Sequence, residues 1–311
     1  MAGIFIYAEN KDITLQMLTL GLQLKRSMPE DVCAITLDKE QAQDLLTAGA
    51  DKVYVLENES TWPEAYAKAI ADLLKTEEAV LFVVGASARG RDIAARVAAY
   101  LKTGLVSDAI KVDFTDGGVE TQRLMYGGAV LCTEAIQGMA VVSVAPGKYP
   151  PALPAGENNG EIIRVAAEAQ MDVTINQVEP VLRLGTDIKR AKNVLGVGRG
   201  IAQKEDMGMA EELAAAIGAE LGCTRSIAEE LHWLPNEVYI GISGQTIRPE
   251  LYLAIGISGQ IQHVAGIRDA GTIVAIDKNE NAPIFKAADY GIVGDLYEIL
   301  PLLTEAVKEL E

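Results

Sequence analysis

Cysteine and histidine, the residue types from which most disulfide and transition-metal sites are built, are scarce in this chain. Its 311 residues include three cysteines and two histidines. Cys33, Cys132 and Cys223 lie far apart without a CxxC motif, so small buried thiols are favoured over disulfides, zinc or iron–sulfur ligation. With only His232 and His263 available, a site built from several histidines is excluded. This usage suits a reducing cytoplasm.

Long apolar runs and an excess of positively charged residues are also lacking. Apolar residues make up 49% of the sequence, yet no run of about 18 apolar residues occurs, which argues against a membrane-spanning helix. The beginning, MAGIFIYAEN, has no basic leader or cleavage site and is typical of a first strand. The formal net charge of −17 repels phosphate backbones. We therefore expect a cytoplasmic protein with no nucleic-acid partner and no membrane span.

The first hundred residues show a regular alternation of two patterns. Short apolar runs alternate with segments of helical apolar spacing, which predicts an α/β domain with a parallel sheet between two layers of helices. The segment 85–92, which holds glycine, serine and two arginines, could bind an anion, but a helix cap is slightly favoured. The expected strands are 3–9, 32–37, 52–56 and 79–84, and the expected helices are 12–25, 39–48, 63–74 and 93–101.

The pattern changes after residue 104. Strands joined by glycine-rich turns predict an antiparallel extension of the sheet, and four prolines make 146–159 a surface loop. Polar residues at 187–191 separate two apolar patterns, and about two domains suit this length. We therefore divide the chain into domains 1–188 and 189–311. The expected strands of this region are 109–114, 119–126, 139–144, 161–165 and 173–184.

The second domain contains the same pentapeptide, GISGQ, at 241–245 and again at 256–260. The apolar runs 238–240 and 251–255 precede the two copies and predict buried strands that lead into turns. Because parallel sheets bind ligands beyond the carboxyl ends of their strands, both copies are expected at one ligand-binding edge. The second copy is expected to open a short helix, whose free N–H groups favour an anion.

Six further stretches make this interpretation specific. They are 198–200 (GRG), 223–225 (CTR), 249–252 (PELY), 256–263 (GISGQIQH), 282–285 (APIF) and 288–295 (ADYGIVGD). In this order, they resemble the FAD domain of the electron transfer flavoprotein alpha subunit over roughly the last third of the chain. The rest resembles the family mainly in organisation. The resemblance implies two doubly wound parallel-sheet domains, Rossmann-like at the N-terminus and a DHS-like FAD-binding domain at the C-terminus.

The resemblance also implies roles for residues near the flavin. Arg199 is expected to meet the FAD pyrophosphate, although GRG alone lacks the full GxGxxG spacing. Arg225, next to Thr224, is expected over the flavin ring, where its charge favours reduced, anionic forms. The Ser243 hydroxyl is expected at flavin N5. Ile242 departs from the family's frequent glutamine, which leaves the flavin potential in doubt. Helix capping, turn formation and solvated charge are the structural alternatives.

The second pentapeptide and the helix after it supply the next contacts that the resemblance implies. Ser258 and Gly259 are expected to offer hydroxyl and N–H groups to the pyrophosphate. Gln262 is expected at the ribityl chain or ring edge, and His263 at the flavin O2 side. Without the resemblance, a lone histidine is better explained as a satisfied structural residue.

The adenosine end completes the set. The resemblance implies that Asp277, where the family frequently has asparagine, binds the ribose or caps a turn, and Asp295 with Leu296 is expected to flank the adenosine. Asp295 is also placed to cap the closing helix. The predicted FAD contacts are Arg199, Thr224, Arg225, Gly241, Ile242, Ser243, Gly244, Ser258, Gly259, Gln260, Ile261, Gln262, His263, Asp277, Asp295 and Leu296.

These residues favour an electron carrier over a substrate-converting enzyme. No Ser-His-Asp set, carboxylate pair or metal cluster stands out beside them. The resemblance implies an alpha subunit that pairs with a beta subunit and exchanges electrons with a flavoprotein dehydrogenase of the acyl-CoA dehydrogenase type, in fatty acid or carnitine metabolism. Electron bifurcation stays open. The alternatives are a self-contained FAD- or NAD-dependent oxidoreductase and a nucleotide-binding sensor without redox work.

Overall fold

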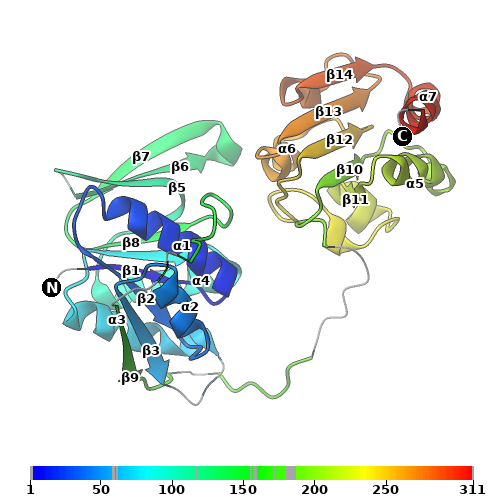
Figure 1. Ribbon diagram of the computed structural model, residues 1–311. Coiled ribbons are helices and arrows are strands. Elements are labelled where there is room, and N and C mark those ends of the chain that lie inside the picture. Colours follow the sequence, from blue (N-terminus) through cyan, green and yellow to red (C-terminus); the bar gives the residue numbers. More distant parts are fainter. Residues whose placement is uncertain are drawn as a thin grey trace. The chain divides into compact units, whose positions relative to one another are not determined.

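The computed structural model describes residues 3–57, 60, 62–116, 118–154, 156, 160–170, 173–179 and 187–309. The chain forms two compact units, Met1–Asn176 and Gln177–Glu311 (Figure 1). Each unit is an α/β structure built around its own sheet. The predicted fold class is therefore confirmed.

The described residues of the first unit form a nine-stranded sheet in the order β7-β6-β5-β8-β4-β1-β2-β3-β9. Neighbours are parallel except where β6 runs antiparallel to both β5 and β7. The strands are β1 (Gly3–Tyr7), β2 (Asp31–Thr36), β3 (Lys52–Glu57), β4 (Leu81–Gly85), β5 (Leu105–Thr115), β6 (Gly118–Met125), β7 (Val130–Ile136), β8 (Ala140–Val144) and β9 (Glu161–Ala166). The helices are α1 (Lys11–Leu24), α2 (Gln41–Thr47), η1 (Pro63–Tyr66), α3 (Ala67–Thr76), α4 (Ala88–Leu101) and the turn η2 (Tyr126–Gly128).

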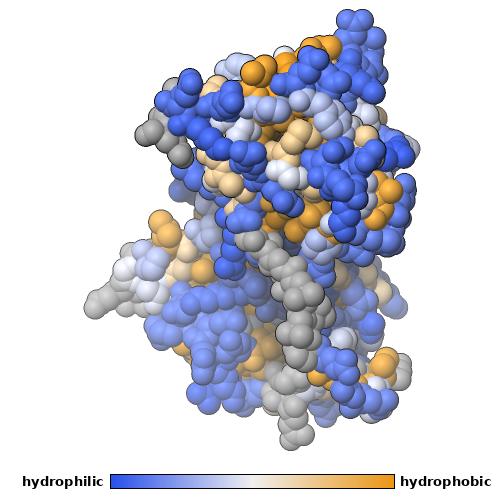
Figure 2. Space-filling view, turned by 90° about the vertical axis from the view of Figure 1, so that its right-hand side faces the viewer, coloured by the Kyte–Doolittle hydropathy of each residue, from blue (hydrophilic) through white to orange (hydrophobic). Residues whose placement is uncertain are grey.

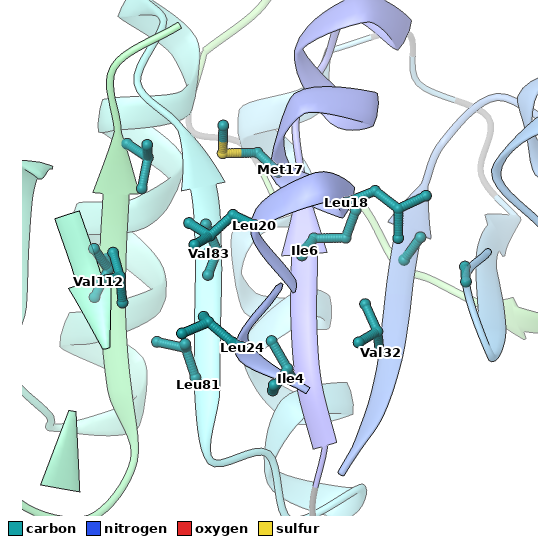
Figure 3. Close-up of a cluster of buried hydrophobic side chains, with 14 of the residues drawn as sticks. Ile4, Ile6, Met17, Leu18, Leu20, Leu24, Val32, Leu81, Val83 and Val112 are labelled. Atoms are coloured by element: carbon teal, nitrogen blue, oxygen red, sulfur yellow. The ribbon is translucent and has the colours of Figure 1, made fainter. Parts of the chain in front are cut away.

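The parallel strands are apolar on both faces because a helical layer covers each face. In β1, Ile4 and Ile6 pack with side chains of α1, whereas Phe5 and Tyr7 belong to the cluster that α3 and α4 cover. Figure 3 shows the first of these clusters, where the α1 side chains lie over β1, β2 and β4. The alternation of side chains along each strand thus builds two cores from one sheet.

The segment 85–92 caps a helix, as slightly favoured from the sequence. The Ser87 side chain is the N-cap of α4 and accepts a hydrogen bond from Gly90 N at 2.9 Å. Arg91 pairs with Asp108 at 2.7 Å and Arg89 lies 3.5 Å from Glu64. Both arginines are therefore engaged by carboxylates.

Two expectations for residues 104–184 need correction. β5, β6 and β7 do form the antiparallel extension, but β7 was not predicted, and β8 returns to lie parallel between β4 and β5. The β8 side chains are fully buried in an apolar run, which cannot indicate strand direction. Of the strand predicted over 173–184, residues 173–179 form no strand, and the rest lies outside the described residues.

The described residues of the second unit form a five-stranded parallel sheet in the order β11-β10-β12-β13-β14. Apolar clusters cover both of its faces. The strands are β10 (Asn193–Val197), β11 (Glu220–Cys223), β12 (Leu251–Ile255), β13 (Thr272–Asp277) and β14 (Tyr290–Val293). The helices are η3 (Lys204–Asp206), α5 (Met207–Ala216), the π-helical turn η4 (Ser226–Glu230), η5 (Asn236–Val238), α6 (Ile261–Ile267), η6 (Pro283–Lys286) and α7 (Leu296–Lys308).

The run 238–240 is not a strand of this sheet, contrary to expectation. It forms an isolated parallel bridge between Tyr239 and Cys223, and a second between Ile240 and Gln245. Its apolar side chains are buried in the core, which explains the strand-like pattern. The first pentapeptide therefore follows a short segment beside the edge strand β11.

The surface of the chain is mixed. On the face drawn in Figure 2, hydrophilic residues cover most of the area and hydrophobic residues lie in small groups. Among the residues that the structure describes, no helix has the length and apolar character needed to cross a membrane.

Candidate functional site

A cavity of about 630 Å³ lies at the carboxyl edge of the second sheet. Each of the five strands contributes to its wall at or just beyond the strand's end. Arg199 follows β10, Thr224 follows β11, Ser258 follows β12, Asp277 ends β13, and Asp295 follows β14. In the chain, β11 is added on one side of β10 and β12 on the other, so the sheet reverses its winding between β10 and β12. Such switch points are where open α/β sheets bind ligands.

Backbone contact between two glycine turns forms the centre of this edge. Gly200 N donates to Gly256 O at 2.9 Å. A Cβ atom on Gly200 would lie 2.3 Å from Gly256 Cα, and one on Gly198 would lie 2.2 Å from Gly256 O. Gly256 itself has φ of +58°, which side-chain-bearing residues rarely adopt. Glycine at these positions is what allows the turns after β10 and β12 to touch.

The second pentapeptide continues as a tight turn against another loop. Ser258 O accepts a hydrogen bond from Ile284 N at 3.0 Å. A Cβ atom on Gly259 would lie 2.3 Å from that same nitrogen, and Gly259 has φ of +81°. Gln260 is then the N-cap of α6. The exposed Ser258 side chain, one of the predicted FAD contacts, lines the cavity.

The first pentapeptide is folded differently and forms the cavity wall beside β11. The Ser243 hydroxyl lies 2.8 Å from the Tyr239 hydroxyl, and both residues line the cavity. Ile242 N donates to Gln262 O at 3.0 Å, which ties this loop to α6. The Ile242 side chain is 57% exposed and does not line the cavity.

His263 lines the cavity but uses both ring nitrogens within the protein. Nδ1 lies 3.1 Å from Ile240 O, and Nε2 lies 2.8 Å from the Tyr252 hydroxyl. A carbonyl oxygen only accepts, so Nδ1 carries the proton and Nε2 accepts from Tyr252. Burial lowers the pKa of His263 to about 4, against a smaller opposing effect of the Ile240 hydrogen bond. The ring is therefore neutral near pH 7 and joins α6 to the loop beside β11.

Charged side chains of both signs line the cavity. Arg225 Nε contacts Glu229 Oε2 at 2.6 Å, a hydrogen bond that raises the pKa of the guanidinium. Arg199 is exposed and forms no ion pair with the residues that the structure describes. Lys278 also lines the cavity. Arg199 is therefore placed to meet an incoming anion without first breaking a contact.

The two predicted aspartates act as caps. Asp277 Oδ1 accepts from Asn279 N at 2.8 Å, and Asp295 Oδ1 accepts from Tyr297 N at 2.9 Å as the N-cap of α7. The predicted capping role of Asp295 is thus confirmed. The Tyr297 hydroxyl donates to Asp206 at 2.6 Å, which holds α7 to the loop before α5.

The structure brings most of the predicted residues together around one cavity. Twelve of them line it: Arg199, Thr224, Arg225, Ser243, Ser258, Gly259, Gln260, Gln262, His263, Asp277, Asp295 and Leu296. Four do not: Gly241, Ile242, Gly244 and Ile261. Sequence reasoning missed Tyr239, Lys278 and Tyr297, although each lies beside a predicted motif. Glu230 was missed as well, and no sequence signal marked it.

Fold and cavity together define a two-unit α/β protein with a cavity at the strand switch point of its second sheet. Residues 5–170 match the electron transfer flavoprotein domain, and residues 187–268 match the electron transfer flavoprotein FAD-binding domain. Among curated proteins, YdiR of Escherichia coli K12, whose name assigns it to the electron transfer flavoprotein subunits, is 40% identical over 88% of this chain and 89% of its own. FixB of Salmonella typhimurium is 38% identical over 91% of this chain and 92% of its own.

The chain belongs to the electron transfer flavoprotein alpha-subunit family. Two predictions from the sequence are thereby confirmed: the family, and FAD as the cofactor for which the matching domain is named. Membership also implies a beta subunit as partner.

Proposed function

We propose that this chain holds one FAD in the second-unit cavity and, paired with a beta subunit, passes electrons between a flavoprotein dehydrogenase of the acyl-CoA dehydrogenase type and a redox partner. Bound FAD supplies a group that takes up and releases electrons singly or in pairs. The work of the chain is then to hold that group, set its surroundings and present it to partners.

The order of the strands is the observation that carries this proposal. Of the contacts implied for the flavin, Arg225 and Ser243 lie at β11 and the loop beside it, and Gln262 and His263 lie on α6, which a hydrogen bond ties to that loop. The contacts implied for the pyrophosphate follow β10 and β12, and those for adenosine follow β13 and β14. The residues thus occur along the sheet in the order of the parts of FAD. Five strands spaced about 4.8 Å apart span roughly 19 Å, which suits an extended dinucleotide.

The donor set also fits a diphosphate at the centre of this edge. The exposed Ser258 hydroxyl and the Arg199 guanidinium line the cavity where the turns after β12 and β10 meet. Gly198 and Gly256 let the two turns touch, which brings Arg199 and Ser258 to the same edge of the sheet. Arg225 also lines the cavity, with Glu229 as its ion-pair partner at 2.6 Å.

An exposed apolar arm supports docking of the beta subunit on the first unit. The arm consists of Leu124, Tyr126, Val130 and Leu131, on β6, η2 and β7, with exposed fractions of 39%, 78%, 47% and 53%. β7 is an edge strand, and exposed edge strands with apolar side chains are typical of association surfaces. We assign the arm to the subunit interface.

Purification with the beta subunit tests the proposal. We expect one FAD in the alpha chain, seen as blue-light absorption that Arg199→Ala reduces and the matched surface change Arg190→Ala does not. Acyl-CoA plus an acyl-CoA dehydrogenase is expected to bleach that absorption. If the absorption of the complex of the two subunits persists with every acyl-CoA dehydrogenase tested, this choice of electron donor is contradicted. Steady NADH oxidation by the chain alone would favour the alternative, a self-contained oxidoreductase.

A further inference from the structure

A second cavity, of about 300 Å³, lies in the first unit, away from every residue assigned to FAD. It is at the carboxyl ends of β1 and β2, and Ser60 and Pro63, which come after β3, also line it. Glu9 follows β1, Thr36 and Asp38 come from the end of β2, and Pro63 begins η1. Its volume is at the lower end of the range of small-molecule sites.

Two buried polar atoms at this cavity lack partners. Tyr7 is 1% exposed, yet its hydroxyl has no hydrogen-bond partner among the described residues. The same holds for Glu9 Oε2. Both residues line the cavity. Because nearly all buried polar groups are hydrogen-bonded, a donor-bearing molecule in the cavity would supply the partner that this hydroxyl and this carboxylate lack.

The charge of the cavity excludes phosphate. Glu9 and Asp38 line it, and no described arginine or lysine does. The nearby Arg89 is held by Glu64 at 3.5 Å and lies 4.2 Å from the centre of the Trp62 ring. The adjacent start of α1 is also closed to an anion, because the Asn10 side chain already accepts from the first N–H groups.

The placement of the acids indicates the ligand. In sheets of this strand order, an acidic side chain after the second strand hydrogen-bonds ribose hydroxyls. Asp38 occupies that position and is fixed by accepting from Glu40 N and from the Gln41 amide, each at 2.9 Å. Leu37 and Pro63 add an apolar wall, against which a flat base can pack.

We propose that this cavity binds an uncharged nucleoside. Its ribose hydroxyls donate hydrogen bonds to Glu9 and Asp38, and its base packs against Leu37 and Pro63. The site is separate from the FAD cavity. It differs from a nucleotide site in that phosphate is rejected by the two carboxylates.

Calorimetric titration with adenosine tests this proposal on the full chain with its beta subunit. Excess FAD is present so that adenosine does not enter the second-unit cavity. We expect one adenosine per alpha chain, with AMP and 2′-deoxyadenosine each bound at least tenfold more weakly. The beta subunit is also present in the calorimeter and could itself bind adenosine. The variants Glu9→Gln and Asp38→Asn therefore locate the site on the alpha chain. Each variant is expected to lower the affinity for adenosine at least tenfold while leaving the FAD content unchanged.

Asp72→Asn is the matched control, because Asp72 pairs with Lys68 on α3 outside the cavity. It is expected to bind adenosine as the unmodified chain does. No binding of adenosine at millimolar concentration, equal binding of AMP, or unchanged affinity in both cavity variants would each overturn the proposal. Circular dichroism of each variant confirms that the fold is retained.

Discussion

His263 shows how a side chain that lines the cavity can have both of its ring nitrogens engaged within the protein. Its two ring nitrogens join α6, through Tyr252 and Ile240, to the core and to the loop that carries Ser243. The resemblance assigned the ring to the flavin O2 edge, but in this structure a ring N–H reaches that edge only if one of these two hydrogen bonds breaks. We therefore regard His263 as a residue that positions the first pentapeptide relative to the second.

The depressed pKa of His263 predicts a pH dependence of stability. In the unfolded chain the ring gains its proton near pH 6.5, whereas in the folded chain burial delays this to about pH 4. The stabilisation is therefore complete above about pH 6.5 and declines as pH falls toward 4, by up to about 3 kcal/mol. Urea unfolding of the second unit at pH 7.5 and 5 measures it. His263→Gln is expected to remove most of the difference.

His232→Gln provides the control, because the other histidine of the chain is exposed. It is expected to keep the pH dependence of the unmodified protein. If the free energy of unfolding changes equally between pH 7.5 and 5 in the two variants, His263 does not control the acid sensitivity of this unit.

The two predicted FAD arginines differ in their contacts, and this predicts different losses. Arg199 forms no ion pair with the described residues, so Arg199→Ala removes only a phosphate contact of about 1.5–3 kcal/mol, or roughly tenfold to 150-fold in FAD affinity. Arg225→Ala is expected to retain more FAD but to lower its reduction potential, because a cation beside the reduced ring is lost. Fluorescence titration and potentiometry measure the two effects.

Glu229→Gln separates these effects further, since it releases Arg225 from its 2.6 Å partner. It is expected to shift the potential upward, opposite to Arg225→Ala. If both arginine variants lose FAD equally and keep the same potential, the division of roles is wrong.

At the scale of elements, the contact between the turns after β10 and β12 is the feature most sensitive to a single added atom. Gly256 has φ of +58°, and a Cβ atom there would lie 2.5 Å from Gly200 Cα. Gly256→Ala is therefore expected to destabilise the second unit by about 1–3 kcal/mol and to weaken FAD binding. Denaturant unfolding and FAD content measure the result.

Gly208→Ala is the matched substitution with the opposite expected sign. Gly208 lies within α5, and a Cβ atom there meets nothing within 4 Å. Gly208 is the second residue of the helix, where alanine is favoured over glycine by up to about 0.5–1 kcal/mol, the value for a helix interior, so this variant is expected to be more stable. A destabilised Gly208→Ala together with a neutral Gly256→Ala would refute the packing argument.

The two pentapeptides also show what the sequence could and could not predict. The copy at 256–260 follows a strand of the sheet and precedes a helix, as local pattern indicated. The identical copy at 241–245 follows the segment 238–240, which forms only an isolated bridge to β11. The side chains of this segment are buried by packing in the core, and burial alone gave the segment its strand-like apolar pattern. Likewise, the Tyr239 hydroxyl is held at the cavity by Ser243, and the Tyr297 hydroxyl by Asp206. The spacing of residues in the sequence does not predict either hydrogen bond.

At the scale of the whole molecule, each unit presents a ligand-sized cavity at the carboxyl edge of its sheet. In the second unit, two glycine turns lie at that edge and side chains of both charges line it. In the first unit, Glu9 and Asp38 follow β1 and β2, and no described arginine or lysine lines the cavity. Under the two proposals, similar α/β construction would serve a diphosphate in one unit and an uncharged ligand in the other.

Association with the beta subunit belongs to the same scale, and Tyr126 offers its sharpest test. This residue is 78% exposed at the end of the apolar arm, and its backbone has φ of +52°. That conformation is unfavourable for tyrosine but tolerated by asparagine. Tyr126→Asn therefore relieves backbone strain while removing an apolar ring from the surface. The fold is expected to be unharmed or slightly more stable, whereas the affinity for the beta subunit falls at least tenfold, about 1.4 kcal/mol.

Tyr290→Asn is the matched control, because Tyr290 is 67% exposed on β14 of the second unit, outside the arm. Analytical ultracentrifugation of each variant with the beta subunit gives the two affinities, and thermal unfolding of the chain alone gives the stabilities. Opposite signs for stability and association in Tyr126→Asn identify an interface residue, since a residue needed only for folding would lower both. Weaker association in Tyr290→Asn than in Tyr126→Asn would instead move the interface to the second unit.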